Sequence, residues 1–186
     1  KINSKTKVIM IINVLGLCSN LIKLKKFCKK NKIILIEDNC ESLGGKYKNK
    51  NLGTFGDFGT FSFYYSHQIT SGEGGMVTTN SLELEGKLKA LRSHGITKNP
   101  SEFINSMSAK EPWYYEQQSL GFNYRMSDLQ AALGLNQLGR LGHFVKTRNN
   151  IAQKYNNLFR LNGAIRTPII KKNCISSFHL YVIRLS

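Results

Sequence analysis

The chain has 186 residues, 41% of them hydrophobic, so it can bury the core of one domain or most of one. Twenty-seven Lys and Arg against eleven Asp and Glu give a net charge of +16, which raises the question of nucleic-acid binding. Many of these lysines surround one short predicted helix or alternate with polar residues at 46–50, without an aromatic-interleaved basic stripe. We therefore expect no nucleic-acid partner, and a solvated positive surface that attracts an anionic substrate.

The four cysteines lack the paired close spacing of zinc or iron–sulfur sites, so we expect free thiols and no metal. We find no secretory signal and no apolar run long enough to cross a bilayer, which favours the cytoplasm and no membrane association. The chain opens with Lys1 and ends in HLYVIRLS, a pattern typical of a strand cut short. We therefore expect a fragment of a longer protein.

The first elements predict a β-α-β unit. Residues 8–14 (VIMIINV) form a continuous apolar run, as expected of a strand buried on both faces of a parallel sheet. Ser19 or Asn20 can cap the next helix, in which Leu21, Leu24, Phe27 and Cys28 recur at helical spacing. A second buried strand is predicted at 33–36 (IILI). This order implies an α/β fold with a mostly parallel sheet.

Carboxylates follow the second strand directly, at Glu37, Asp38 and Glu41. In open α/β sheets ligands collect at the carboxyl ends of strands. Further strands are predicted at 60–64 and 76–79. The glycine-dense segments before each of them allow the backbone to approach a ligand closely or to take positive φ.

The second half alternates helices with one long connection. Leucine spacing predicts an amphipathic helix at 81–92, and residues 97–118 have no clear period and predict a long functional loop. Ser127 starts a further helix that glycines at 139 and 142 interrupt, after which a second helix follows. A final strand is predicted to begin near Phe178.

Three side chains have both an ordinary and a chemical interpretation. Asp38 can be a cap or turn residue, or it can pair with a ring nitrogen of a bound cofactor and keep that nitrogen protonated. Ser62 can be an ordinary strand hydroxyl, and His67 an ordinary loop imidazole. Each signal is weak when taken alone.

Taken together, the motifs are specific. IEDNCESLGGKYKNKNLGTFGDFGTFSF, YYSHQITSGEGGMVTTN, LRSHGITKNP and LGFNYRMSDLQAALGLNQL resemble, in order and spacing, the DegT/DnrJ/EryC1/StrS family of sugar aminotransferases. The resemblance covers nearly the whole chain. It implies a three-layer large domain of the aspartate-aminotransferase type. Residues 1–140 would form part of the domain that binds pyridoxal phosphate, and residues 141–186 the connecting helix and the start of the small C-terminal domain.

The resemblance also implies site residues, position by position. Asp38 corresponds to the residue that contacts the pyridine nitrogen, Glu41 to one that lies against the cofactor ring, and Ser62 to the phosphate-binding hydroxyl. Asn123 resembles a residue that reaches the cofactor phosphate of the neighbouring subunit, which implies a homodimer with shared active sites. Arg125 would support that phosphate or the substrate.

His67 stands where the family carries its Schiff-base lysine. Imidazole cannot form that bond, although its pKa suits acid–base work. A subset of the family with the same replacement removes the 3-hydroxyl from a nucleotide-linked 4-keto-6-deoxyhexose, with glutamate converting the cofactor to pyridoxamine phosphate. EDNCES, GTFG and the FYSH-like segment resemble that subset, and the hypothesis is that His67 is the acid–base group.

Two alternatives stay open. The stretch PWYYEQQSLGFNYRMSDLQAALGLNQLGRL resembles the transaminases that install a 4-amino group on UDP-linked keto sugars on the way to pseudaminic acid. The other alternative is a non-catalytic relative without the lysine, which binds a cofactor or a partner, or a broken gene fragment.

Overall fold

The computed structural model describes residues 2–105 and 111–186. The chain forms two compact units. The first contains Lys1–Asn80 and Asp128–Ser186, and the second contains Ser81–Ser127.

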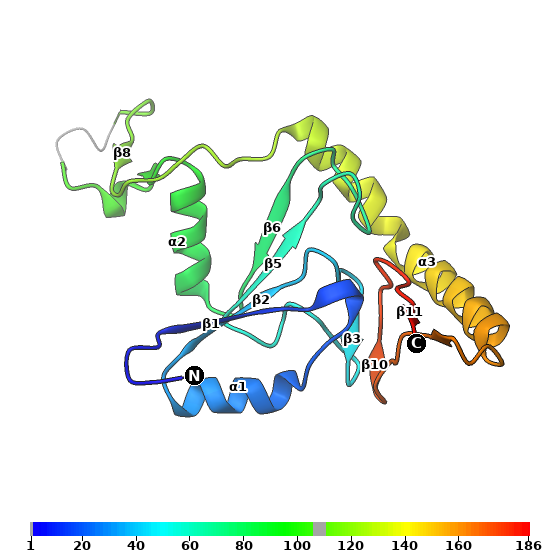
Figure 1. Ribbon diagram of the computed structural model, residues 1–186. Helices are drawn as coiled ribbons and strands as arrows, with labels where there is room; N and C mark the ends of the chain where they lie inside the picture. The colour runs from blue at the N-terminus through cyan, green and yellow to red at the C-terminus, as the bar shows by residue number, and fades with distance from the viewer. Residues whose placement is uncertain (1, 106–110) are drawn as a thin grey trace. The chain divides into compact units, whose positions relative to one another are not determined.

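A four-stranded sheet is the centre of the first unit (Figure 1). Its order is β1-β2-β5-β6, with bounds Val8–Ile12, Ile34–Asp38, Phe58–Ser62 and Gly75–Thr78. β1, β2 and β5 run parallel, and β6 pairs antiparallel with β5. The predicted α/β fold with a mostly parallel sheet is therefore confirmed.

Helix α1 (Leu21–Lys30) connects β1 to β2 and covers one face of the sheet (Figure 1). The side chain of Asn20 accepts a hydrogen bond from the Lys23 amide and so satisfies one of the free N–H groups at the helix start. Leu21 and Cys28 are buried, and Cys28 packs with Leu35 of β2. The predicted apolar stripe is therefore confirmed for Leu21, Leu24 and Cys28, whereas Phe27 is 39% exposed.

The opposite face of β1 is open. Val8, Met10 and Ile12 are 45%, 56% and 53% exposed, so the prediction of a strand buried on both faces is wrong for the described chain. Side chains alternate along a strand, which directs Ile9 and Ile11 toward α1 and the other three away from it. No described segment covers these three side chains.

Glu37 is the fully buried carboxylate of the sheet. Its Oε1 accepts hydrogen bonds from the amides of Phe55 and Gly56 at 2.6 and 2.7 Å, and its Oε2 accepts one from Gly53 at 3.0 Å. A buried charge is tolerated when charge-assisted hydrogen bonds replace its water. Glu37 therefore shapes the loop that leads into β5.

The glycines of that loop approach protein backbone. A Cβ on Gly59 would lie 2.2 Å from the Gly53 carbonyl oxygen, and one on Gly56 would lie 2.5 Å from the Leu35 oxygen. Gly53 also has a φ of +82°, which L side chains rarely adopt. The dense glycines thus allow the loop to fold tightly onto β2 and β5.

Helix α3 (Asp128–Phe159) is one continuous helix of 32 residues, so the predicted interruption at Gly139 and Gly142 is wrong. Each glycine costs about 1 kcal/mol in a helix interior, a cost that packing can offset. Val145 lies against Gly44, where an added Cβ would be 2.7 Å from its Cγ2. The expected boundary between residues 140 and 141 falls inside this helix, and the assignment to two domains stays a prediction.

The described helices include none that is long and apolar enough to cross a bilayer.

Short elements complete the first unit. β10 (Cys174–Ile175), β3 (Lys46–Tyr47) and β4 (Lys50–Asn51) form one antiparallel sheet, and β11 (Arg184–Leu185) pairs with β9 (Ile165–Arg166). The predicted strand near Phe178 is wrong.

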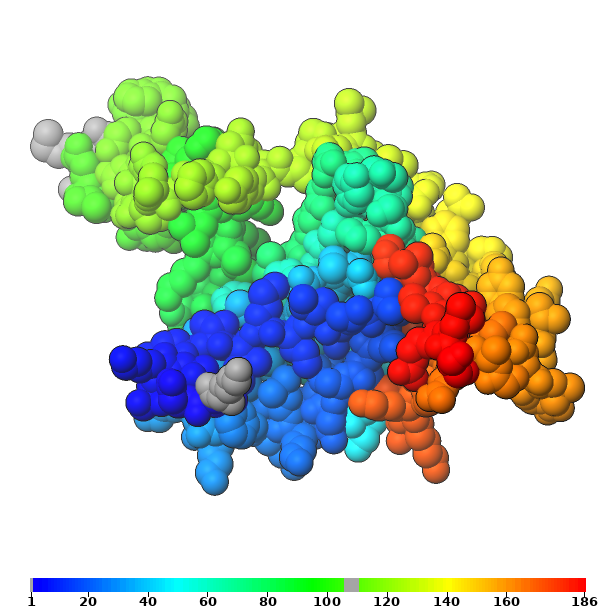
Figure 2. Space-filling view, in the orientation of Figure 1, coloured from blue at the N-terminus to red at the C-terminus, as the bar shows by residue number. Residues whose placement is uncertain are grey.

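Phe178 is buried with a positive φ of 43°, which a strand does not allow. Arg148 of α3 donates hydrogen bonds to the carbonyls of Phe178 and His179 at 2.8 and 3.1 Å. The C-terminal residues lie against the N-terminal part of the unit (Figure 2). A Cβ on Gly16 would be 2.7 Å from Ser177 Oγ, and Gly16 ends the short helix η1 (Val14–Gly16).

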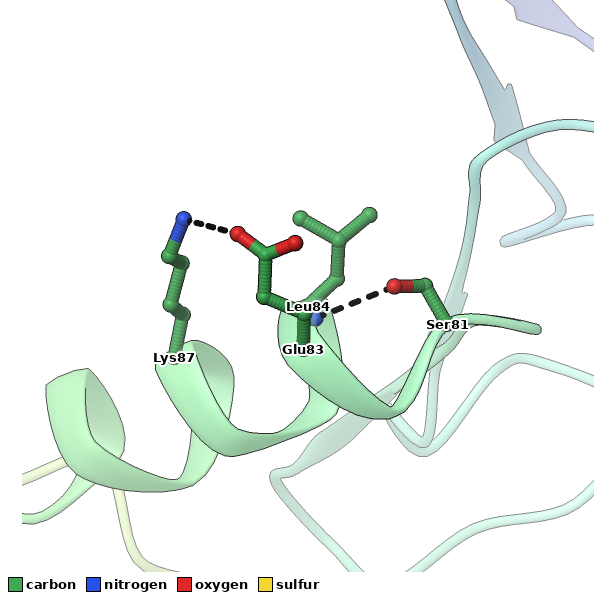
Figure 3. A network of polar contacts seen from close by, with 4 residues as sticks. All are labelled: Ser81, Glu83, Leu84 and Lys87. Atoms are coloured by element: carbon green, nitrogen blue, oxygen red, sulfur yellow. Dashed lines mark hydrogen bonds and ion pairs between the residues drawn. The ribbon is translucent and has the colours of Figure 1, made fainter.

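The second unit begins with helix α2 (Leu82–Arg92), whose first turn appears in Figure 3. Ser81 Oγ accepts from the Leu84 amide at 3.3 Å, and Lys87 pairs with Glu83 at 2.6 Å. The predicted helix is confirmed, although none of its residues is buried within the described chain.

The long connection predicted at 97–118 contains short elements. β7 (Ile96–Thr97) pairs with β8 (Glu116–Gln117), and η2 (Pro100–Glu102) lies between them. Residues 106–110 of this segment lie outside the described residues.

The substitution Glu37→Gln should lower the free energy of unfolding by about 2–4 kcal/mol. An amide presents an NH₂ group to one of the three N–H donors and removes the charge from the other two hydrogen bonds. Urea denaturation measures the effect, with Glu73→Gln as the control because Glu73 is exposed. A change no larger than that of the control would contradict the role of Glu37.

Candidate functional site

Asp38 and Ser62 end neighbouring parallel strands on the same face of the sheet. Asp38 is the last residue of β2 and pairs in register with Thr60, and Ser62 follows two residues later at the end of β5. Residues two apart share a face, and strand spacing puts the two Cα atoms roughly 8 Å apart. Both side chains are half-buried and lie on the face opposite Glu37.

A buried network holds these strand ends together. Asn13 Nδ2 donates to Asn39 Oδ1 at 2.8 Å, and Ser42 Oγ donates to the same oxygen at 3.0 Å. The Asn13 amide also donates to the Asp38 carbonyl at 3.0 Å. Sequence reasoning missed Asn13 and Asn39. Their signal was an asparagine directly after each of two apolar strands, where a buried amide needs partners.

Asp38 also shapes its own turn. Its Oδ1 accepts a hydrogen bond from the Cys40 amide at 3.0 Å, as aspartates in turns commonly do. Burial raises the pKa of the Cys40 thiol to about 11, and the neighbouring Asp38 carboxylate adds to this effect. The turn interpretation of Asp38 therefore holds alongside any chemical one.

Glu41 forms hydrogen bonds with three different segments of the chain. Its Oε2 accepts from the Leu15 amide at 2.6 Å, and its main-chain oxygen accepts from Gln68 Nε2 at 2.5 Å. Ser177 Oγ donates to the same main-chain oxygen at 3.3 Å. Glu41 thereby connects η1, the segment after His67 and the C-terminal segment.

His67 lies beside a second imidazole, that of His179. The two ring centroids are 5.4 Å apart, and the planes are inclined by 56°. The Nδ1 atoms of both rings are buried without a hydrogen-bond partner among the described residues. The His67 amide donates to the Tyr64 carbonyl at 3.1 Å, which fixes the turn that carries the ring.

A cavity of about 310 Å³ opens at His67. It is bordered by the segment 65–70 and by one side of α3. The lining residues are Tyr65, His67, Gln68, Ile69, Thr70, Gln137, His143, Phe144, Thr147 and Arg148. None of these described lining residues is a lysine, so they offer no primary amine to the cavity.

His179 is the residue at this site that sequence reasoning missed. Burial lowers the pKa of its imidazole below the usual value of 6.5, and the charges of His67 and Arg148 add to this effect. The Glu41 carboxylate opposes it. The sequence signal for a constrained histidine was weak. It was the position of His179 in HLY, within a run of apolar residues.

Asn123 and Arg125 belong to the second unit, where both are exposed. Asn123 forms an isolated β-bridge with Ser93, and the Tyr124 amide donates to the Arg92 carbonyl at 2.9 Å. Their contact with a cofactor phosphate across a dimer stays a prediction.

Known proteins resemble this chain along its whole length. A transaminase from Campylobacter jejuni that acts on UDP-4-amino-4,6-dideoxy-N-acetyl-beta-L-altrosamine is 38% identical over 95% of the chain and 44% of the relative. An aminotransferase of pseudoaminic acid biosynthesis from Helicobacter pylori matches with a TM-score of 0.87 at 34% identity, covering 100% of this chain and 47% of that one.

A dehydratase structure is similarly close. GDP-4-keto-6-deoxy-D-mannose-3-dehydratase from E. coli, solved with hydrated pyridoxal phosphate, matches with a TM-score of 0.84 at 30% identity. The match covers 100% of this chain and 48% of the dehydratase chain. The chain thus spans about half the length of the relatives it matches. Because the model of the pyridoxal-phosphate-dependent DegT/DnrJ/EryC1/StrS aminotransferase family matches residues 1–186, the chain belongs to that family.

Proposed function

We propose that the protein containing this chain removes the 3-hydroxyl from a nucleotide-linked 4-keto-6-deoxy sugar, with His67 as the acid–base group. The proposal rests on His67, which the sequence resemblance aligns with the family's lysine position. Its buried Nδ1 has no partner among the described residues, and the cavity beside it has no lysine in its lining. Such a site suits proton transfer without a covalent link to the cofactor.

The described residues fit a vitamin B6 cofactor. Asp38 and Ser62 share the open face at the carboxyl edge of the sheet, at a spacing on the scale of an aromatic ring with a phosphate arm. Asp38 would pair with the ring nitrogen, and Ser62 would bind the phosphate. Glu41 would lie against the ring, held by its bond to the Leu15 amide.

When bound as pyridoxamine phosphate, the cofactor supplies the amine that condenses with the sugar ketone and the ring that withdraws electrons. The imidazole of His67 would accept a proton from the carbon attached to the cofactor's amine nitrogen and would donate one to the departing hydroxyl. A neutral imidazole is the form that accepts the proton. Burial lowers the pKa of His179, so its ring carries a positive charge beside His67 less often than an exposed imidazole would at the same pH.

The remaining partners follow from the same proposal. Glutamate is the expected amino donor. Asn123 and Arg125 are expected to contact the cofactor phosphate or the substrate of a neighbouring subunit, which requires a homodimer. The cytoplasmic location stays a prediction.

A 4-aminotransferase is the second candidate. The 38% identity to the Campylobacter jejuni transaminase and the fold match to the Helicobacter pylori aminotransferase favour it. In that case another amine would have to replace the missing lysine, or the chemistry would proceed without one.

The product distinguishes these functions. Full-length protein is incubated with cofactor, glutamate and a nucleotide-linked 4-keto-6-deoxy sugar, and the product is analysed by mass spectrometry. Loss of one oxygen without gain of nitrogen is expected, and His67→Asn should slow it roughly 10²- to 10⁴-fold. A stable amino sugar would identify an aminotransferase, and a folded protein that converts neither substrate would indicate a non-catalytic relative.

Introducing an amine at position 67 should restore covalent attachment of the cofactor. Borohydride is expected to fix pyridoxal phosphate to the His67→Lys variant and not to the parent, because only a primary amine forms the reducible bond. Intact-mass analysis and peptide mapping measure the adduct. His94→Lys serves as the control for non-specific labelling. An adduct on any lysine of the parent protein would refute the role given to His67.

The pKa of His179 should lie below 6.5 in an NMR titration, so more than half of its imidazole is neutral at pH 6.5 and protonation follows at lower pH. His179→Asn assigns the signal. Glu41→Gln should lower the pKa further, because the carboxylate favours the protonated ring, and Arg148→Gln should raise it. A pKa at or above 6.5, or shifts of the opposite sign in both variants, would contradict this electrostatic account.

A further inference from the structure

Two thiols from distant parts of the sequence lie side by side. The Sγ atoms of Cys18 and Cys174 are 3.0 Å apart, although 156 positions separate the residues. Both side chains are partly exposed and carry free thiols. A disulfide has an S–S length of about 2.05 Å, so the sulfurs need to move together by only about 1 Å.

Each of the two cysteines belongs to a segment that its own hydrogen bonds hold in place. Cys18 precedes the Asn20 cap of α1, and Cys174 begins β10, where it pairs in register with Tyr47 of β3. Both side chains pack against the same buried cluster of Leu21, Tyr47, Leu52 and Phe55. Their proximity therefore follows from the packed core and is not an accident of two exposed side chains.

We propose that Cys18 and Cys174 are a redox modification site that closes to a disulfide with a small-molecule disulfide such as oxidised glutathione. One cysteine displaces a glutathione thiol and forms a mixed disulfide. The other cysteine then displaces the second glutathione. In total the two cysteines lose two electrons and two protons. One S–S bond forms between them while the S–S bond of glutathione disulfide breaks, and two glutathione thiols are released. This inference is independent of the proposed function.

The surroundings of the pair set how fast it reacts. Burial raises the pKa of Cys18 to about 12, and its hydrogen bond with Cys174 adds to this, while Lys171 opposes it. Only the thiolate is nucleophilic, so the raised pKa of Cys18 slows attack by this thiol near neutral pH, and its attack becomes faster as the pH rises.

The disulfide would restrain the segment that carries His179. Ser176 and Ser177 are buried directly after β10, and Ser177 Oγ accepts from Gln68 Nε2 at 3.3 Å. Cys174 precedes His179 by only five positions in the chain. Joining Cys174 to the segment before α1 anchors this stretch covalently at one end, so its local opening becomes rarer.

The test compares reduced and oxidised full-length protein. Each sample is denatured, alkylated and weighed. Oxidation with glutathione disulfide is expected to remove two alkyl groups, and peptide mapping should link Cys18 to Cys174. The Tm should rise by roughly 5–10 °C, because the cross-link restricts the unfolded chain. Hydrogen exchange at 176–179 should slow on oxidation.

Matched variants separate the pair from the other thiols. Cys174→Ser and Cys18→Ser should each abolish the cross-link, whereas Cys40→Ser should retain it, since Cys40 is also partly exposed. An unchanged number of alkylated thiols, a stable glutathione adduct without the cross-link, or a link through Cys40 would overturn the site. Unchanged exchange at 176–179 despite the cross-link would overturn the restraint on that segment.

Discussion

The first unit depends on the carboxylate of Glu37, buried in the sheet and bonded to three backbone amides of the loop 53–56. The loop supplies the donors that replace water around the charge, and the charge in turn determines where the loop lies. β5 begins directly after this loop, so its register against β2 follows from the same contact. Neighbouring Asp38, which points the opposite way, is thereby presented on the other face.

For this reason the two faces of the sheet carry different kinds of side chain. One face carries Leu35 and Glu37 and is closed by α1. The other carries Asp38 and Ser62 at its carboxyl edge and stays accessible beside the exposed side chains of β1. Alternation along a strand therefore separates the residues that stabilise the fold from those proposed to bind the cofactor.

A second constraint is the packing of the C-terminal segment on η1. Leu15 and Gly16 adopt positive φ, and the close approach of Ser176 and Ser177 to Gly16 leaves no space for a Cβ there. This contact, together with the hydrogen bonds from Arg148, brings His179 to His67 and Cys174 to Cys18. The proposed proton transfer and the proposed disulfide therefore both involve the same anchored segment.

The sequence by itself determined the β-α-β unit, the helix at 81–92 and the position of Asp38 at a strand end, because these follow from local periodicity and turn chemistry. It limited the cap of α1 to Ser19 or Asn20, and it led to the prediction that His67 replaces the family's lysine. Only the tertiary structure decided that α3 passes through two glycines, that Phe178 turns instead of extending, and that His179 meets His67. These outcomes rest on contacts between residues thirty or more positions apart, where packing overrides the local preference that a sequence pattern reports.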